Sequence, residues 1–565
     1  MQYQINIHDR NYSSWEIQPF DKNLVDKTPF VKNWFEEKLF HEDIFEITKD
    51  EINILSSKTR DAKSIAGVLI LEKNKTFGRT PNKKRLYYSC IPHDKHLPTF
   101  LVPYDIDIGF EKVFPNKYVL FRFDHWLNQE KHPYGILVET IGDVTNLFYH
   151  DIYQIHTKNL HHPHKHIQKQ IQHHMKNKTL DACIQEIMSD PNRLDKIEDR
   201  QIEDRQIEDR RIEDRNIFSI DPTGCMDRDD AISIHTIIPN HKYQVSVYIA
   251  NVAIWIEYFQ LYTFLQETNI STIYLQDTVI PMLPTALSEK ICSLDQTHDC
   301  FAIVMDFEVD LLAKTIQYLD TKQCVIRVKR NFDYNSKGLE SYSPYKNLLT
   351  VTQTLHPEVK ESHALVAFWM MQMNQEMARE LQRNKTGIFR ISRMKSDKIR
   401  ADPNKDIFLY IWENAISGKY VAYSDNISDY THAVIDVPIY THFTSPIRRI
   451  VDVYNQIAWI STREIASMDI EKINRDTKTI RKIQQESKIL YLLQDTHSLQ
   501  IEGQILQIEE KNILVYFPEY KCTLSCKTTP HSEWQQYQTV QCRIYMFERE
   551  TDYRKKIKME IIYTI

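Results

Sequence analysis

The chain has 565 residues, of which 42% are apolar and 11% aromatic, and its formal net charge is −6. At about 100–200 residues per domain, this length predicts three to five folded units. The charge excludes a uniformly basic nucleic-acid-binding coat but is compatible with a local basic channel. No apolar run approaches the roughly 20 residues of a membrane span and no signal peptide opens the chain, so we expect an intracellular, cytoplasmic protein without a membrane partner. Nine cysteines lack the paired spacing of a metal site, which predicts reduced thiols.

The first 155 residues have the pattern of β-structure, with short apolar runs separated by Gly, Pro and polar residues. Candidate strands cover residues 65–71, 86–91, 118–123 and 133–142. We divide this part into an N-terminal extension (1–30), a first β unit (31–95) and a second β unit (96–155). Aromatic side chains of the second unit belong either to a barrel core or to a surface that binds single strands.

Residues 156–215 are predicted to link the β units to the next part of the chain. Seven histidines lie between His156 and His174, and their irregular spacing fits a solvated connector better than the alternative, a metal site. The tetrapeptide Ile-Glu-Asp-Arg then occurs four times, at 197–200, 202–205, 207–210 and 212–215. This five-residue period places no isoleucine stripe on one helix face, so we predict a charge-balanced linker without chemistry of its own.

Four aspartates crowd the next segment, namely Asp221, Asp227, Asp229 and Asp230. Apolar runs flank the segment, while Pro222 and Gly224 break the chain within it, which predicts a loop held between two strands. Carboxylates this close repel one another unless they stay exposed or share divalent cations, and Mg²⁺ and Mn²⁺ prefer such oxygen ligands. By itself, the segment fits a two-metal phosphodiesterase site, a calcium loop or a solvated acidic turn.

Further along, residues 440–449 predict the start of a helix that faces a phosphate. Thr444 or Ser445 can cap this helix, Pro446 suits its first turn, and apolar residues follow at helical spacing. Arg448 and Arg449 would then lie at a helix N-terminus, where backbone N–H groups and a guanidinium favour a phosphate. The alternative is a capped helix whose arginines pair with surface acids.

Together, the two segments resemble the catalytic (RNB) domain of the ribonuclease II/ribonuclease R family, which includes the catalytic-subunit branch of the exosome. The aspartates follow Ile-Asp-Pro at the family's spacing, and Thr-Ser-Pro-Ile-Arg-Arg at 444–449 matches its downstream segment. Four intervening stretches also match the family pattern: Tyr274-Leu275, Val279–Pro284, Leu287-Ser288 and Cys292–Leu294. The resemblance covers most of residues 216–497.

The resemblance implies a multidomain α+β protein in which a central RNB catalytic domain (216–497) is flanked by β-barrel OB folds. The two N-terminal β units resemble the family's cold-shock-like barrels, the second more closely than the first, and residues 498–565 resemble an S1-like barrel. The segment ahead of residue 65 is shorter than an additional PIN nuclease domain would be. We therefore expect a monomer that has exonuclease activity alone and no stable association with an exosome core.

The same resemblance implies processive hydrolysis of single-stranded RNA from a free 3′ end, with Mg²⁺ (or Mn²⁺) as cofactor and nucleoside 5′-monophosphates as products. The four aspartates would hold two metal ions, and we expect substitution of Asp229 or Asp230 to be most damaging. Arg448 would hold a phosphate near the scissile bond and offset its developing charge. Tyr274 would stack on a base near the 3′ end, the alternative being a buried core tyrosine. Arg449 and Arg390 would make further contacts with RNA.

The sequence departs from the family pattern at several polar positions, namely Asn251, Asn269, Cys300, Ser392 and Gln456. None of them lies in the aspartate segment, so hydrolysis stays the main prediction, while RNA affinity and rate are in question. The first alternative is an RNA-binding protein that keeps the RNB fold with weak or no catalysis. The second is a DNA nuclease, which the family's sensing of the 2′-hydroxyl argues against.

Overall fold

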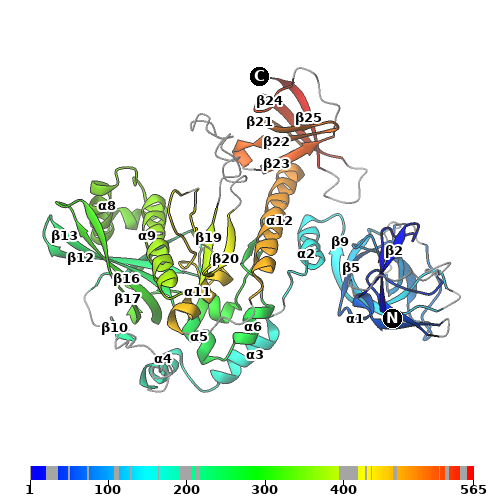
Figure 1. Cartoon of the computed structure of the whole chain (residues 1–565), viewed down its shortest axis with the longest axis horizontal. Helices are drawn as coiled ribbons and strands as arrows, with labels where there is room; N and C mark the ends of the chain where they lie inside the picture. Colours follow the sequence, from blue (N-terminus) through cyan, green and yellow to red (C-terminus); the bar gives the residue numbers. More distant parts are fainter. Residues whose placement is uncertain are drawn as a thin grey trace.

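The computed structural model describes residues 2–20, 36–48, 51–72, 75–106, 114–127, 130–162, 164–190, 207–211, 215–392, 418–426, 429–433, 435–461, 468–520, 522–527, 534–547 and 557–564. Figure 1 shows a β-rich N-terminal part, a central part in which helices cover a large sheet, and a small C-terminal sheet at the end of one long helix. Within the described residues, no helix is long and apolar enough to cross a membrane. All nine cysteines are free thiols, as predicted.

The N-terminal part consists of an open sheet packed against a closed barrel. The sheet has the order β2-β1-β3-β4 and contains β1 (Gln2–Ile7), β2 (Trp15–Pro19), β3 (Ile44–Thr48) and β4 (Glu51–Ser56). After the short α1 (Lys58–Asp61), the barrel closes in the order β5-β6-β7-β9-β8 from β5 (Ile65–Leu69), β6 (Leu86–Pro92), β7 (Phe100–Tyr104), β8 (Lys117–His125) and β9 (Tyr134–Asp143). Both units share one core, in which Phe45 of the sheet and Phe121 of the barrel are fully buried.

This architecture corrects two predicted boundaries. All four candidate strands exist, but they belong to one barrel, and the boundary placed between residues 95 and 96 falls between its neighbours β6 and β7. The expected extension 1–30 is wrong too, because it contains β1 and β2. The hydrophobic pattern located the strands correctly, whereas their grouping depends on barrel closure, which pairs β5 with the distant β8.

The predicted linker is largely structured where it is described. It contains α3 (Lys165–His174), α4 (Leu180–Ser189) and the short β10 (Glu208–Asp209), and it follows α2 (Leu147–Thr157). The first two Ile-Glu-Asp-Arg copies lie outside the described residues. The third copy is not a free linker, because β10 pairs in parallel with a strand of the central sheet and Arg210 forms a bidentate pair with buried Asp306, at 2.8 and 3.1 Å.

The central sheet has the strand order β10-β17-β16-β13-β12-β11-β18. Its other members are β11 (Phe218–Asp221), β12 (Asp230–Ile238), β13 (Lys242–Ala250), β16 (Asp299–Asp310), β17 (Thr315–Arg327) and β18 (Arg330–Asp333). Both faces are covered, so side chains of β13 alternate between two cores: Val247 and Ile249 enter one, Tyr248 and Ala250 the other.

Helices cover both faces of the central sheet. The core that contains Val247 includes residues of α8 (Ser343–Leu355) and α9 (Ser362–Arg383), next to the short α7 (Lys337–Ser341). The methionine stripe of α9 is core, as its helical spacing predicts: Met373, Met377 and Leu381 are fully buried. The core that contains Tyr248 includes residues of α5 (Val252–Tyr258), α6 (Tyr262–Glu267) and α11 (Ile450–Ile460).

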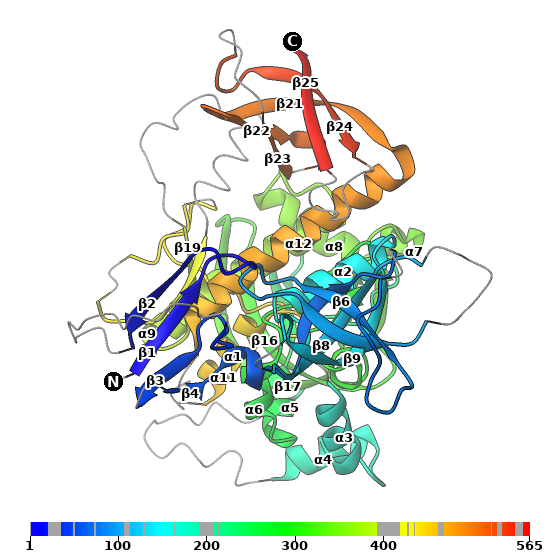
Figure 2. The same ribbon diagram turned by 90° about the vertical axis from the view of Figure 1, so that its right-hand side faces the viewer.

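The long α12 (Ile470–Thr496) leads from the central part to the C-terminal sheet, as Figures 1 and 2 show from two sides. That sheet has the order β23-β22-β21-β24-β25 and follows the turn of α12 at residue 497, where the boundary was predicted. Its strands are β21 (Ser498–Glu509), β22 (Asn512–Phe517), β23 (Cys522–Cys526), β24 (Thr539–Met546) and β25 (Ile557–Thr564), with the 3₁₀ turn η4 (Pro518–Tyr520) between β22 and β23. The chain is thus a multidomain α+β protein.

Candidate active site

The aspartate segment is a rigid loop between β11 and β12, which pair antiparallel through Phe218 and Ile232. Gly224 has a φ of +79°, a conformation that favours glycine, and the turn closes with a 3.0 Å bond from Cys225 N to the Pro222 carbonyl. Two further bonds hold the end of the loop: Arg228 N donates to Ser293 Oγ at 3.1 Å, and Ala250 N donates to the Asp229 carbonyl at 2.8 Å. The predicted loop between strands is confirmed.

The Arg448 segment differs from its prediction, because α11 begins at Ile450 with Arg449 as its N-cap. Thr444 and Ser445 therefore do not cap the helix, and Pro446 is not in its first turn. The physical reason is an extended Arg449, whose φ and ψ are −139° and 126° and which forms a β-bridge with Ser271.

This bridge brings two distant segments side by side. Thr272 N donates to the Arg448 carbonyl at 3.0 Å, and Ile450 N donates to the Ile270 carbonyl at 2.9 Å. The bonded stretch runs directly into β14 (Ile273–Tyr274), which pairs with β15 (Val279–Ile280). Tyr274 is thereby positioned next to Arg448 by backbone bonds.

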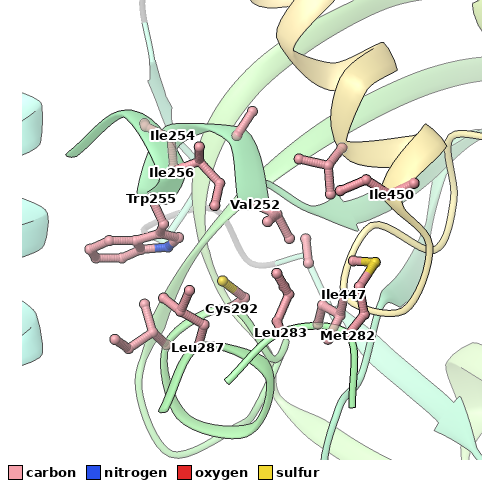
Figure 3. Packing of buried hydrophobic residues seen from close by; sticks show 14 of the residues in the cluster. Val252, Ile254, Trp255, Ile256, Met282, Leu283, Leu287, Cys292, Ile447 and Ile450 are labelled. Carbon is pink, nitrogen blue, oxygen red and sulfur yellow. The ribbon is translucent and has the colours of Figure 1, made fainter. Parts of the chain in front are cut away.

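A buried apolar cluster holds the Arg448 segment against the segment that contains Tyr274. Figure 3 shows Ile447 beside Met282 and Leu283, with Val252 of α5 and Ile450 on one side of them and Leu287 and Cys292 on another. Leu287 lies on the π-helical turn η3 (Ala286–Ile291), a geometry that is frequent at functional sites. The core thus holds the Arg448 segment and the 274–292 segment together.

A cavity of about 610 Å³ joins the main predicted site residues. All four aspartates, Arg448 and Tyr274 line it. Tyr274 is 44% exposed, so the alternative of a buried core tyrosine is wrong. The cavity collects residues from five separate stretches of the chain, around positions 221–230, 272–274, 279–289, 334 and 448.

Asp229 is the link between the aspartate loop and the Arg448 segment. Its side chain is 3% exposed, its Oδ1 accepts a 2.8 Å bond from Ile447 N, and its Oδ2 accepts a 2.9 Å bond from Arg448 Nε. Burial raises the pKa of Asp229 to about 7, and the neighbouring Arg448 opposes this shift. Asp229 therefore orients the Arg448 guanidinium, which is itself about half exposed to the cavity.

Asp221 and Asp230 form a crowded pair in the same cavity. Burial raises the pKa of Asp221 to about 6, although Ser219 Oγ donates to its Oδ2 at 2.7 Å. Burial also raises the pKa of Asp230 well above its usual value, and the charges of Asp221 and Asp229 add to this shift. Crowded carboxylates that favour protonation are sites where a cation would relieve repulsion.

The carboxylate donors suit a hard divalent cation, but their positions do not form a ready cage. Among the residues that the structure describes, no group of three or more His, Cys, Asp or Glu side chains is arranged to hold a metal ion. Asp229 is engaged by Arg448 and Asp227 receives a 3.4 Å contact from Cys225 Sγ. A metal site at this cavity is therefore supported by donor chemistry and not by coordination geometry. The alternative histidine metal site at 156–174 falls under the same negative finding.

Two predicted RNA-binding arginines lie outside the cavity. Arg449 Nη2 donates to Asp452 Oδ1 at 2.8 Å. Arg390, on β19 (Ile388–Ile391), lies over the ring of Tyr420 on the adjacent β20 (Lys419–Ala422), with its guanidinium 4.6 Å from the ring centroid. Burial lowers the pKa of Arg390, and the charges of Arg481 and Arg449 act in the same direction, so the three arginines form a cationic cluster beside the site.

The structure also adds cavity residues that sequence reasoning missed. Tyr334 follows β18, whose parallel pairing sets Asp333 opposite Asp221, and its ring stacks on His363 with centroids 3.6 Å apart. Burial and the charges of Asp230 and Asp221 raise the pKa of Tyr334 to about 12. Glu289 of η3 also lines the cavity. No local sequence motif predicts either residue. The pairing of β18 with β11 positions Tyr334 at the cavity, and the π-helical turn η3 positions Glu289 there.

The departures from the family pattern lie away from the cavity, and two of them have clear structural roles. Asn251 caps α5 through a 3.1 Å bond from Ile254 N, and its Nδ2 donates to Gln323 at 2.9 Å. Gln456 accepts from Val252 N and Ala253 N and donates to the Ala250 carbonyl. All five residues are buried and none lines the cavity, including Asn269, Cys300 and Ser392.

Family models match two parts of the chain. The RNB domain matches residues 209–338, which include the aspartate loop and Tyr334, and the Dis3-like cold-shock domain 2 matches residues 87–149, which include β7, β8 and β9. Residues 209–338 therefore belong to the RNB domain family. The second match runs across the predicted boundary at 95/96, in agreement with the closed barrel.

Curated relatives are similar to part of the chain. Ribonuclease R of Thermotoga maritima is 32% identical over 141 residues, which are 24% of this chain and 20% of that protein. The exosome complex exonuclease dis3 of Schizosaccharomyces pombe is 27% identical over 339 residues, 46% of this chain and 34% of that protein. The matches thus span at most about a third of either relative's length.

Solved structures share the fold over a greater length. Mycoplasma genitalium RNase R aligns over 100% of both chains in its apo form, with a TM-score of 0.66 and 16% identity, and has a TM-score of 0.64 in its complex with ribose-methylated single-stranded RNA. Yeast Ssd1, described as a pseudonuclease, has a TM-score of 0.52 and 12% identity over 97% of this chain and 81% of that one. At these identities the likeness shows the fold alone.

Proposed function

We propose that this RNB-family protein is a hydrolytic 3′-to-5′ exoribonuclease that degrades single-stranded RNA processively to nucleoside 5′-monophosphates. One observation carries the proposal: four aspartates, Arg448 and an exposed Tyr274 line one cavity. The carboxylates suit cations, the guanidinium suits a phosphate, and the tyrosine ring suits a base. These are the three groups that a phosphodiesterase for single strands has to contact.

In this proposal Asp221, Asp227, Asp229 and Asp230 hold two Mg²⁺ ions, for which Mn²⁺ can substitute. Bound there, the ions would activate a water and stabilise the leaving oxygen of the phosphodiester. Arg448 binds the phosphate and offsets the negative charge that develops on its oxygens. Asp229 acts twice, because its charge also keeps Arg448 Nε in place at 2.9 Å.

Tyr274 binds the 3′-terminal part of the strand. Its ring is exposed in the cavity, and the bonded stretch 270–272 fixes it relative to Arg448. A base stacked on this ring would place a defined phosphate at the aspartates, so the ring helps to set the length of the last, undegraded product.

The flanking units deliver the strand. We propose that the barrel β5–β9 is the second cold-shock-like OB fold, that the preceding sheet β1–β4 belongs to the first, and that residues 498–565 form an S1-like OB fold. The cationic cluster of Arg390, Arg449 and Arg481 would contact RNA phosphates outside the cavity. The protein would act as a monomer, in the cytoplasm and without an exosome core.

The second candidate is an RNA-binding protein with the RNB fold and without hydrolysis. The fold likeness to the pseudonuclease Ssd1 favours it. The departures that motivated it, at Asn251, Asn269, Cys300 and Ser392, do not, because all four are buried and none lines the cavity. All four aspartates and Arg448 are present, so we retain the enzyme as the first candidate.

A hydrolysis assay separates the two candidates. Purified protein is incubated with 5′-labelled single-stranded RNA and Mg²⁺, and Asp230→Asn is compared with the matched control Asp181→Asn, an exposed aspartate on α4. We expect progressive shortening by the wild type and the control, and a rate at least about 100-fold lower for Asp230→Asn, on the scale of losing one preorganised charge at a reacting group. Retention of RNA without shortening by the wild type would establish the binding protein instead. Equal degradation of DNA would contradict RNA specificity.

Product length tests the tyrosine. With Tyr274→Ala, we expect the final product to change in length by at least one nucleotide, because the base at the 3′ end loses its stacking surface. Tyr274→Phe keeps the ring and is the matched control. An unchanged final product in Tyr274→Ala would remove Tyr274 from the proposed site.

A further inference from the structure

A second cavity, of about 510 Å³, lies on the N-terminal barrel, away from the aspartates. It is formed by β5, the end of β6 with the loop that follows it, β8, α2 and the loop between β1 and β2. OB barrels usually bind nucleic acid over their second and third strands, which correspond to β6 and β7 here. Of these two strands, only the end of β6 (Ile91 and Pro92) lines the cavity and no residue of β7 does, so the cavity lies beside that surface. Its volume is within the range of small-molecule sites.

One wall of the cavity is cationic. Arg10 is held in place by three backbone carbonyls: its Nε donates to Leu97 O at 3.1 Å, and its Nη2 donates to Pro92 O and Asp94 O, at 2.6 and 3.1 Å. Among the described residues, no acceptor is found for Nη1, so a fixed pair of N–H groups remains for a ligand. Lys95 adds a second positive charge, and Glu72 is the carboxylate on the same lining. A phosphate fits this wall.

Another part of the lining is aromatic and contains a buried polar group without a partner among the described residues. Tyr153 stacks on Tyr118 with centroids 4.3 Å apart and meets His93 edge-on at 5.7 Å. Next to it, Gln154 is 4% exposed and lines the cavity, and its Oε1 has no hydrogen-bond partner among the described residues. An unsatisfied buried acceptor is costly, so it points to a ligand that donates a hydrogen bond.

We propose that this cavity binds a nucleotide, with the phosphate at Arg10 and Lys95, the base against the exposed ring of His93 beside Tyr153, and an exocyclic amino group donating to Gln154 Oε1. Adenine and cytosine carry such an amino group, and uracil does not. The nucleotide comes either from an RNA strand or from the pool of free mononucleotides, the product class of the proposed reaction. The site itself does not depend on hydrolysis at the aspartates.

Calorimetric titration of the full chain with AMP, UMP and inorganic phosphate tests the proposal, in EDTA so that no hydrolysis interferes. We expect one AMP per chain, bound more tightly than UMP by about two- to tenfold, the value of one hydrogen bond, and more tightly than phosphate. In Gln154→Leu, AMP and UMP should bind equally. This variant removes an unpartnered polar atom, so it should fold. Lys95→Ala, at an exposed position, should weaken both nucleotides.

Three results would overturn the proposal: no saturable binding of AMP, AMP binding that is unchanged in both Gln154→Leu and Lys95→Ala, or phosphate binding as tight as AMP binding. Loss of AMP binding in Tyr274→Ala alone would place the nucleotide in the aspartate cavity and would also overturn it. A 3′-blocked oligoadenylate identifies the source. Displacement of AMP by the oligomer assigns the site to the RNA strand, and failure to displace it assigns the site to free mononucleotides; both outcomes support a nucleotide site.

Discussion

The contact between α2 and α12 allows a quantitative prediction, because it buries the carboxyl group of Asp151. Asp151 of α2 is 3% exposed, and its Oδ2 accepts a 2.5 Å bond from Ser487 Oγ of α12. Burial raises the pKa of Asp151 from 3.8 to about 6, the bond from Ser487 opposes this shift, and the charges of Asp277 and Glu486 add to it. The charged carboxylate is therefore disfavoured in the folded protein.

The sign and size follow from linkage. Between pH 3.8 and about 6 the folded state holds the proton of Asp151 more tightly than the unfolded state, so stability falls as the pH rises through this window. At about 1.4 kcal/mol per pKa unit, the penalty reaches ~3 kcal/mol above pH 6. Asp151→Asn keeps an acceptor for Ser487 and carries no charge. We expect it to stabilise the α2–α12 contact by up to about 3 kcal/mol at pH 7.5 and to have little effect at pH 4.

Hydrogen exchange in α2 and α12 is the suitable assay, because a multidomain chain need not unfold in a single transition. Protection of both helices should increase in Asp151→Asn at pH 7.5, and it should be unchanged in Asp181→Asn, whose acid is exposed. A loss of protection at pH 7.5 would refute the reasoning. So would an effect of equal size at pH 7.5 and pH 4, since it would show that the charge of Asp151 is not the cause.

Three further substitutions test individual parts of the structure. Gln456→Leu removes the partners of Val252 N, Ala253 N and Ala250 O, so we expect the catalytic domain to lose about 2–4 kcal/mol in urea unfolding; an unchanged midpoint would contradict these bonds. In Gly224→Ala the added Cβ would meet no atom within 4 Å, but a side chain is strained at a φ of +79°. We expect the stability to fall by about 1–2 kcal/mol and the hydrolysis rate to decrease; a faster rate would contradict the proposed role of this turn. Arg210→Met leaves the Asp306 carboxylate buried without its bidentate partner. In thermal unfolding we expect the stability to fall by less than the roughly 3–5 kcal/mol typical of a broken buried ion pair, because Arg215 lies 3.9 Å from Asp306 and remains. A gain in stability would contradict this reasoning.

Local sequence patterns were sufficient to predict features whose residues lie close together in the chain. The aspartate loop was predictable because Pro222 and Gly224 break the chain between two apolar runs, and the α9 stripe because methionines recur at helical spacing. Joining Asp229 to Arg448 required the family resemblance, since 219 residues separate them and their 2.9 Å contact depends on the fold. The family resemblance predicted that the two segments form one site, and the structure shows the hydrogen bond between Asp229 and Arg448 that joins them.

The failures have a common cause in long-range pairing. The helix cap predicted at Thr444 and Ser445 was wrong because Arg449 pairs with Ser271, which no local pattern encodes. The barrel was divided because β5 closes onto β8 across some 50 residues. The third Ile-Glu-Asp-Arg copy reads as a solvated repeat, yet it docks because β17 offers a free edge and Asp306 a buried charge. Tyr334 reaches the site through the pairing of β18 with β11, whereas Glu289 reaches it through the π-helical turn η3.

The most direct test of the account uses one RNA strand with different labels on its 3′-terminal and 5′-terminal nucleotides, incubated with the wild-type protein and Mg²⁺. We predict that the 3′ label appears first and as a nucleoside 5′-monophosphate, while the 5′ label stays in a shortening strand, and that Arg448→Ala abolishes both changes. Release of the 5′ label first, or of internal fragments, or of no nucleotide from a strand that stays bound, would contradict a 3′-to-5′ hydrolytic site at the four aspartates.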